Sequence, residues 1–98
     1  MAPPSQEATL QPDQTVQFQT TTATPQSLEI TNETTDNLAE VFVECATWQD
    51  PPPMPITIDP GKSFHAVAVF GGAPLLVMNA ANPNAPATVQ VTLSVAAA

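Results

Sequence analysis

The chain contains few side chains that could act as a metal ligand, a base or a nucleophile. Among its 98 residues, His65 is the single histidine and Cys45 is the single cysteine. A blue-copper site uses two histidines, one cysteine and a weak methionine ligand, and a structural zinc site uses four ligands. One histidine and one cysteine suffice for neither, so we expect no metal and no cofactor. We interpret Cys45 as a small buried apolar residue in line with Val41 and Val43.

Nucleophilic catalysis by a serine would require its hydroxyl within hydrogen-bond reach of the His65 ring. Ser63 lies two residues earlier on the same face of a predicted strand. Side chains at this spacing are roughly 7 Å apart, which is beyond a hydrogen bond. We therefore interpret His65 as a half-buried strand residue and not as a catalytic base.

Acidic side chains are numerous, but their spacing fits neither a glycosidase nor a calcium loop. Glu40 and Glu44 share one face of a predicted strand, where residues four apart are roughly 13 Å from each other. A glycosidase needs its two carboxyl groups about 5 Å or about 6.5–9.5 Å apart. Asp36, Asp50 and Asp59 lie in predicted loops without the D-x-D-x-D-G spacing of a calcium loop. The glycine motifs that bind phosphates are also missing, so we expect no catalytic residue and no enzyme.

Two aromatic residues, Phe42 and Trp48, are the main candidates for contact with a partner. In the predicted strand that contains them, they fall on the face opposite Val41 and Val43. If the valines face the core, the two rings form an exposed patch, which usually marks an interaction site. In the alternative arrangement, Trp48 folds beneath the prolines of residues 51–53 and covers the edge of the core. The sequence leaves both arrangements open.

The charge balance excludes two kinds of partner. The formal net charge is −8, and Lys62 is the single residue of the Lys and Arg type. Nucleic acids and anionic membrane surfaces are bound through several lysines and arginines, so we expect neither partner. The first residues lack the basic and apolar regions of a signal peptide, and no apolar run is long enough for a membrane span. We therefore expect synthesis in the cytoplasm.

Alternation of apolar and polar residues predicts an all-β fold of about seven short strands. The predicted strands are residues 14–22, 28–31, 38–48, 56–58, 63–70, 75–79 and 87–95. Between them lie segments rich in Pro, Gly, Asn and Asp, and residues 59–62 predict a type II turn with Gly61 at positive φ.

This pattern indicates one small antiparallel β-sandwich over residues 14–98, of the immunoglobulin-like or jelly-roll type. The order of strands and turns resembles that of bacterial and viral immunoglobulin-like modules. That resemblance implies an architecture but no functional residues.

Residues 1–13 are rich in proline and glutamine and show no alternation. We expect them to form an extended arm outside the sandwich. Such an arm has little reason to fold onto its own domain. We therefore expect it to contact a partner molecule through Pro3, Pro4 and Leu10.

Together these features favour a non-enzymatic structural or interaction protein. Small decoration, or cement, proteins of viral capsids resemble the chain in size and fold class. We expect an accessory subunit of a virion or another extracellular assembly, with a protein partner such as a capsid subunit. We also expect the chain to form a homo-oligomer. The alternative is a carbohydrate-binding or adhesion module that stacks sugar rings on Phe42 and Trp48.

Overall fold

The computed structural model describes residues 5–80 and 86–96, which form β-strands and no helix. The strands are β1 (Gln6–Leu10), β2 (Thr15–Phe18), β3 (Gln26–Asn32), β4 (Ala39–Glu44), β5 (Ile56–Ile58), β6 (Ser63–Ala68), β7 (Leu75–Asn79) and β8 (Val89–Val95). In these residues there is accordingly no helix of the length and apolarity that a membrane span requires. The prediction of an all-β fold is confirmed.

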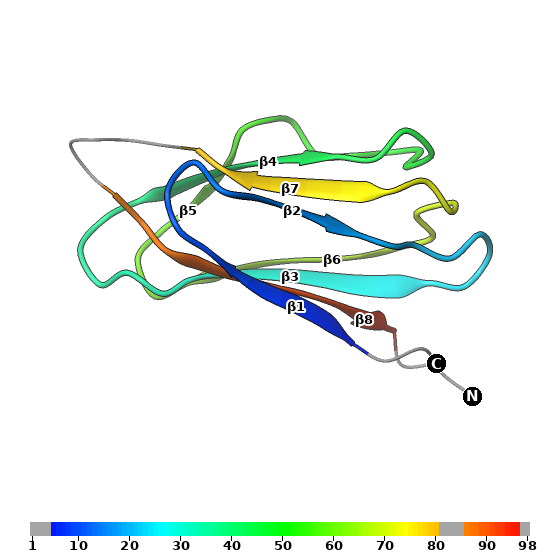
Figure 1. Ribbon diagram of the computed structural model, residues 1–98, viewed down its shortest axis with the longest axis horizontal. Helices are drawn as coiled ribbons and strands as arrows, with labels where there is room; N and C mark the ends of the chain where they lie inside the picture. Colours follow the sequence, from blue (N-terminus) through cyan, green and yellow to red (C-terminus); the bar gives the residue numbers. More distant parts are fainter. Residues whose placement is uncertain (1–4, 81–85, 97–98) are drawn as a thin grey trace.

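The eight strands form two antiparallel sheets that pack face to face (Figure 1). Sheet A has the order β1-β8-β3-β6, and sheet B has the order β2-β7-β4-β5. The strands pair from the ends of the sequence inward, as β1–β8, β2–β7, β3–β6 and β4–β5. The chain is therefore paired like one long hairpin rolled into two layers. Strands β1 and β6 are the edges of sheet A, and β2 and β5 are the edges of sheet B.

The core lies between the sheets and is filled by alternate residues of each strand. Burial of one Val, Leu or Ile side chain contributes about 1.5–3 kcal/mol to folding, so these residues dominate the stability. Strand β4 shows the pattern most clearly, because every second residue is buried and the others are exposed. The largest fully buried apolar side chains are Phe70, Leu28, Ile30, Leu75, Leu93, Val41, Val77, Val89 and Val91.

Two buried asparagines join the sheets at one end of the sandwich. The side-chain amide of Asn79, at the end of β7, donates to the carbonyls of Leu10 at 3.0 Å and Ala87 at 2.8 Å. The side-chain amide of Asn32, at the end of β3, donates to the carbonyl of Ile58 at 3.0 Å. Both asparagines are at most 1% exposed. They satisfy main-chain carbonyls that the sheets leave without a partner, which would otherwise be costly to bury.

The predicted turn over residues 59–62 is confirmed. The N–H of Lys62 donates to the carbonyl of Asp59 at 3.0 Å, and Gly61 has φ of 72°. Glycine adopts this left-handed conformation without a steric penalty, and Pro60 supplies the fixed φ that precedes it. The turn connects β5 of sheet B to β6 of sheet A and so sets where these two edge strands lie.

The prediction that residues 1–13 form an extended arm outside the sandwich is wrong for residues 6–10. Residues Gln6–Leu10 form β1, which pairs with β8 along its whole length. Leu10 is 3% exposed and belongs to the core. The sequence pattern does not reveal this strand because Ala8 and Leu10 are its only apolar residues. Strand β1 therefore forms an edge of sheet A, and the sandwich has eight strands in place of the seven predicted from residue 14 onward.

Candidate interaction surfaces

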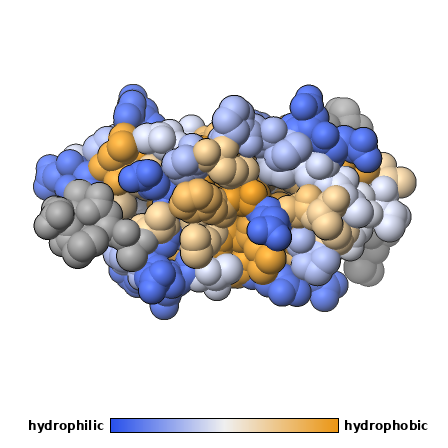
Figure 2. Space-filling view, turned by 90° about the horizontal axis from the view of Figure 1, so that it is seen from above, coloured by the Kyte–Doolittle hydropathy of each residue, from blue (hydrophilic) through white to orange (hydrophobic). Residues whose placement is uncertain are grey.

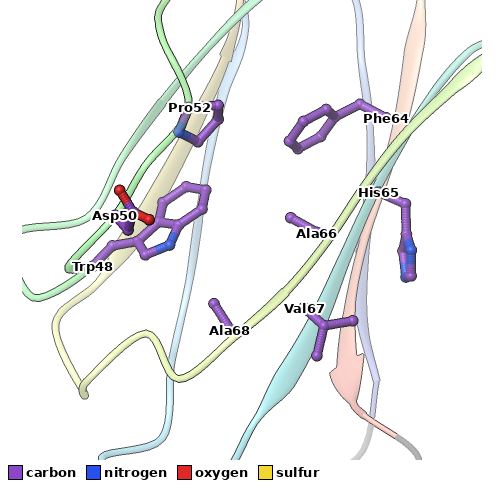
Figure 3. Close-up of a pocket in the computed structure, with 8 residues that line it drawn as sticks. All are labelled: Trp48, Asp50, Pro52, Phe64, His65, Ala66, Val67 and Ala68. Carbon is purple, nitrogen blue, oxygen red and sulfur yellow. The ribbon is translucent and has the colours of Figure 1, made fainter.

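Trp48 lies in the core and not on an exposed face. Its side chain is 9% exposed, and its ring packs edge to face against Phe70 with the ring centroids 5.0 Å apart. The indole also lies beside Pro52 of the connection between β4 and β5 (Figure 3). Of the two arrangements open in the sequence, the structure has the one in which Trp48 covers the edge of the core. Trp48 therefore does not form an exposed aromatic patch together with Phe42.

Phe42 lies on the outer face of sheet B and is 39% exposed. Met78 of β7 is directly opposite Phe42, and Leu76 follows on the same face of β7. Directly opposite residues have their Cβ atoms about 4.5–5.5 Å apart, so these side chains form one apolar surface. We call this set of three residues, Phe42, Leu76 and Met78, the Phe42 patch.

Polar and acidic residues surround the Phe42 patch. Glu40 and Glu44 lie on either side of Phe42 on the outer face of β4, and both are exposed. Thr15 and Gln17 of β2 border the patch across β7, and both are exposed as well. Figure 2 views the molecule from the β4 and β7 side of Figure 1 and shows hydrophobic surface in the middle of this face, with hydrophilic residues around it. The patch thus has an apolar centre and a rim with two carboxylates.

The remaining predicted contact residues are not placed on this surface. Leu10 is buried between the sheets and lies opposite Val89 in the β1–β8 pair. Its carbonyl accepts a hydrogen bond from Asn79. Leu10 therefore acts as a core residue. Pro3 and Pro4 lie outside the described residues.

A groove of about 410 Å³ runs along β6 and is the second candidate surface. Figure 3 shows its two walls. Trp48, Asp50 and Pro52 come from the connection between β4 and β5, and residues 64–68 come from β6. The side chains of Phe64, Ala66 and Ala68 point from β6 toward Trp48, whereas His65 and Val67 lie on the other side of the strand. We call this feature the β6 groove.

The β6 groove exists because the two neighbouring edge strands differ in length. Strand β5 has three residues and pairs only with Ala39–Val41 of β4, whereas β6 has six residues. Beyond the end of β5, the edge of β6 has no strand beside it in sheet B. The inward side chains there are the small Ala66 and Ala68, which are half-buried. Small side chains and a short neighbour together leave the edge of the core open.

His65 is exposed and not half-buried as the sequence suggests. Its Nε2 lies 2.6 Å from the Oγ of Ser27, which is its diagonal neighbour on β3. In the sequence only Ser63 lies close to His65, because the pairing of β3 with β6 is not visible in a local pattern. Ser63 instead bonds to Thr31, with 2.8 Å between the hydroxyl oxygens. The His65 side chain lies on the side of β6 that faces away from the groove (Figure 3).

Cys45 is half-buried and less enclosed than expected from its alignment with the valines of β4. Its Sγ lies 3.5 Å from each of the carbonyl oxygens of Phe70 and Ala73. Its side chain packs against the core cluster, as the sequence predicts for a small apolar residue. Within residues 5–80 and 86–96, no three His, Cys, Asp or Glu side chains gather into a group that could hold a metal ion.

Comparison of the chain with family models, with curated proteins and with solved structures finds no match. Any function for the chain is consequently argued from two surfaces. These are the Phe42 patch on the outer face of sheet B and the β6 groove at the edge of the sandwich.

Proposed function

We propose that the chain is a non-enzymatic subunit that attaches to a larger protein assembly, such as a viral capsid that it decorates. The observation that carries this proposal is the Phe42 patch. It places an exposed aromatic ring and two further apolar side chains at the centre of a face whose other residues are polar. Protein interfaces are enriched in aromatic and methionine side chains and have a polar rim.

The strand order supports a jelly roll and not an immunoglobulin-like sandwich as the scaffold. In the immunoglobulin arrangement the last strand lies in the sheet opposite the first two strands that pair with each other. Here the last strand, β8, lies between β1 and β3. The first strand pairs with the last, the second with the seventh, the third with the sixth and the fourth with the fifth. Eight strands in two Greek keys are paired in this way. Jelly rolls of this kind occur in viral capsid domains, which agrees with a place in a virion or a similar assembly.

The rim of the patch indicates the charge of the partner. Glu40 and Glu44 flank Phe42, and the chain carries a net charge of −8. A second copy of the chain would bring further carboxylates to this face, and like charges facing each other oppose association. A partner surface with an apolar centre and lysines or arginines around it would be complementary. We therefore propose a different, basic protein surface at the Phe42 patch. Homo-oligomers through other surfaces stay a prediction.

The test is size fractionation of the native source together with a matched pair of variants. The proposal predicts that the chain elutes with a particle far larger than 10.2 kDa. Phe42→Ser should release it, whereas Val67→Ser, at a position 55% exposed on the other sheet, should not. Because the rim is charged, the attached fraction should also fall as salt rises. A free monomer that is retained on a polysaccharide column would instead support the carbohydrate-binding alternative.

A further inference from the structure

We infer that the β6 groove is a second binding site, separate from the Phe42 patch, that takes up one extended peptide segment as an added strand of sheet A. The expected segment has apolar side chains at alternate positions and a lysine or arginine that comes to lie near Asp50. Strand addition of this kind draws affinity from main-chain hydrogen bonds and specificity from pockets for alternate side chains. The β6 groove offers both.

The main-chain groups are available because β6 is an edge strand with a single partner, β3. The N–H of Asn32 donates to the carbonyl of Lys62, which fixes the bonding pattern where the β3–β6 pairing begins. In antiparallel pairs, bonded and non-bonded positions alternate, so the even-numbered residues of β6 bond to β3. The N–H and C=O groups of the odd-numbered residues point to the open edge. These residues are Ser63, His65 and Val67.

The groove is lined by these same main-chain groups. His65 and Val67 line it, although Figure 3 shows their side chains on the opposite side of the strand. They therefore reach the groove with main-chain atoms. Within residues 5–80 and 86–96, no backbone or side-chain hydrogen bond satisfies the edge-facing groups of these residues. Unsatisfied edge groups beside a groove are a template for a further strand.

The opposite wall accounts for the side-chain specificity. Trp48 and Pro52 face Phe64, Ala66 and Ala68 across the groove, and all five are apolar. Residues of an added strand that point inward would fill this space at every second position. The volume of about 410 Å³ lies within the range of about 300–1,000 Å³ that is typical of binding pockets.

Charge favours a peptide from another protein over a second copy of this chain. Among the described residues that line the groove, Asp50 is the only acidic one, and Lys62 is the only lysine of the chain. Pairing of β6 with β6 of another copy would bring two walls of residues 48–52, and two Asp50 side chains, to one interface. A single strand with a basic residue avoids this repulsion. Strand β6 also has no lysine or proline of the kind that blocks pairing at natural sheet edges.

The test uses the full chain and a capped six-residue peptide with valine, valine and lysine at the positions that point into the groove and threonine between them. Amide hydrogen exchange is followed by NMR with and without the peptide. We expect exchange at Ser63, His65 and Val67 to slow by about tenfold or more when the peptide is bound. Protection of these amides by raising the protein concentration alone would show that a second copy occupies the edge. Either that result or no binding at all would overturn the proposal.

Two N-methylated peptides separate strand addition from simple apolar contact. N-methylation of the peptide amides that face β6 should weaken binding by about tenfold or more, because each methyl group removes a ladder hydrogen bond. N-methylation of the outward amides should leave binding within about twofold. Equal loss with both peptides would contradict the proposal, and neither result depends on altering the protein.

Variants of the groove provide the complementary control. Ala66→Leu should fill the groove and lower the affinity for the peptide by about tenfold. Val67→Thr, on the outer side of the same strand, should leave this affinity unchanged. Asp50→Asn should lower the affinity for the lysine peptide by about two- to fivefold, a small effect because exposed ion pairs contribute little. The affinity for a peptide of valine and threonine alone should not change. Peptide binding should be unchanged in Phe42→Ser. This last result separates a failure of the groove proposal from a failure of the proposed assembly function.

Discussion

The two edges of the sandwich differ in how their main-chain groups are satisfied. At the edge formed by β1 and β2, the side-chain amide of Gln6 donates to the carbonyl of Gln19 at 2.8 Å and accepts from its N–H at 2.9 Å. At the edge formed by β5 and β6, the outward groups of Ser63, His65 and Val67 have no comparable partner in the part of the chain that the structure describes. A side chain therefore closes the first edge at Gln19, and the second edge borders a groove. We call them the closed edge and the open edge.

The difference follows from strand length and side-chain type. Strand β5 is half as long as β6, so it covers only part of the neighbouring edge. A glutamine amide can donate and accept one hydrogen bond each in the right geometry to replace a strand partner. Among the described residues that line the β6 groove there is no such amide. The comparison shows that an open edge can arise in a well-packed sandwich without any defect in the core. We expect the closed edge to matter for stability and the open edge for binding.

Removal of residues 1–10 should have the largest effect on the closed edge. It takes away β1, all five positions of its pairing with β8 and the buried Leu10. A loss of more than about 5 kcal/mol is expected, which is most of the stability of a small domain. Urea denaturation followed by circular dichroism should show no cooperative transition. A truncated chain that remains folded would restore the view that these residues are an arm outside the sandwich.

Asn79→Ala should have the next largest effect. It leaves the buried carbonyls of Leu10 and Ala87 without their donor, at a cost of about 2–5 kcal/mol in the free energy of unfolding. Asn37→Ala is the matched control, because it removes one more accessible hydrogen bond to the carbonyl of Pro86. That control should cost about 0.5–1.5 kcal/mol. Equal effects of the two variants would contradict the role of Asn79 in joining the two sheets through buried hydrogen bonds.

Gln6→Ala should have the smallest effect of the three. It removes two exposed hydrogen bonds to Gln19 and is expected to cost about 1 kcal/mol. Amide exchange at Gln19 should become faster while exchange in β8 stays slow. If the amide of Gln19 remains protected in this variant, Gln6 does not close this edge, and the two edges do not differ in this respect.

Much of the fold could be predicted from the sequence because apolar and polar residues alternate along most of the strands. The patterns at Val41 and Val43 and at Val89 and Val91 predict which faces of β4 and β8 are buried. Strand β1 was missed because its apolar pattern consists of a small residue and Leu10. Its place in the sheet depends on pairing with β8, at the other end of the chain.

The candidate surfaces were predicted only in part. Alternation places Phe42 on the face opposite Val41 and Val43, but it cannot show that Met78 and Leu76 lie next to it. Whether Trp48 is buried could not be predicted, because its burial depends on the path of the proline-rich connection after β4. The β6 groove was not predicted, since it requires the short pairing of β5 with β4 and the position of that connection. These are contacts between segments far apart in the sequence, which local periodicity does not encode.

The most direct test of the contrast between the edges is amide hydrogen exchange in the free, full-length chain. We expect slow exchange at Gln19 and at the even-numbered residues of β6. We expect exchange at Ser63, His65 and Val67 that is faster by about tenfold or more. Such alternation along one strand would show that one side of β6 is bonded and the other is open. Uniformly slow exchange along β6 in dilute solution would show that the edge is already covered, and would contradict the account.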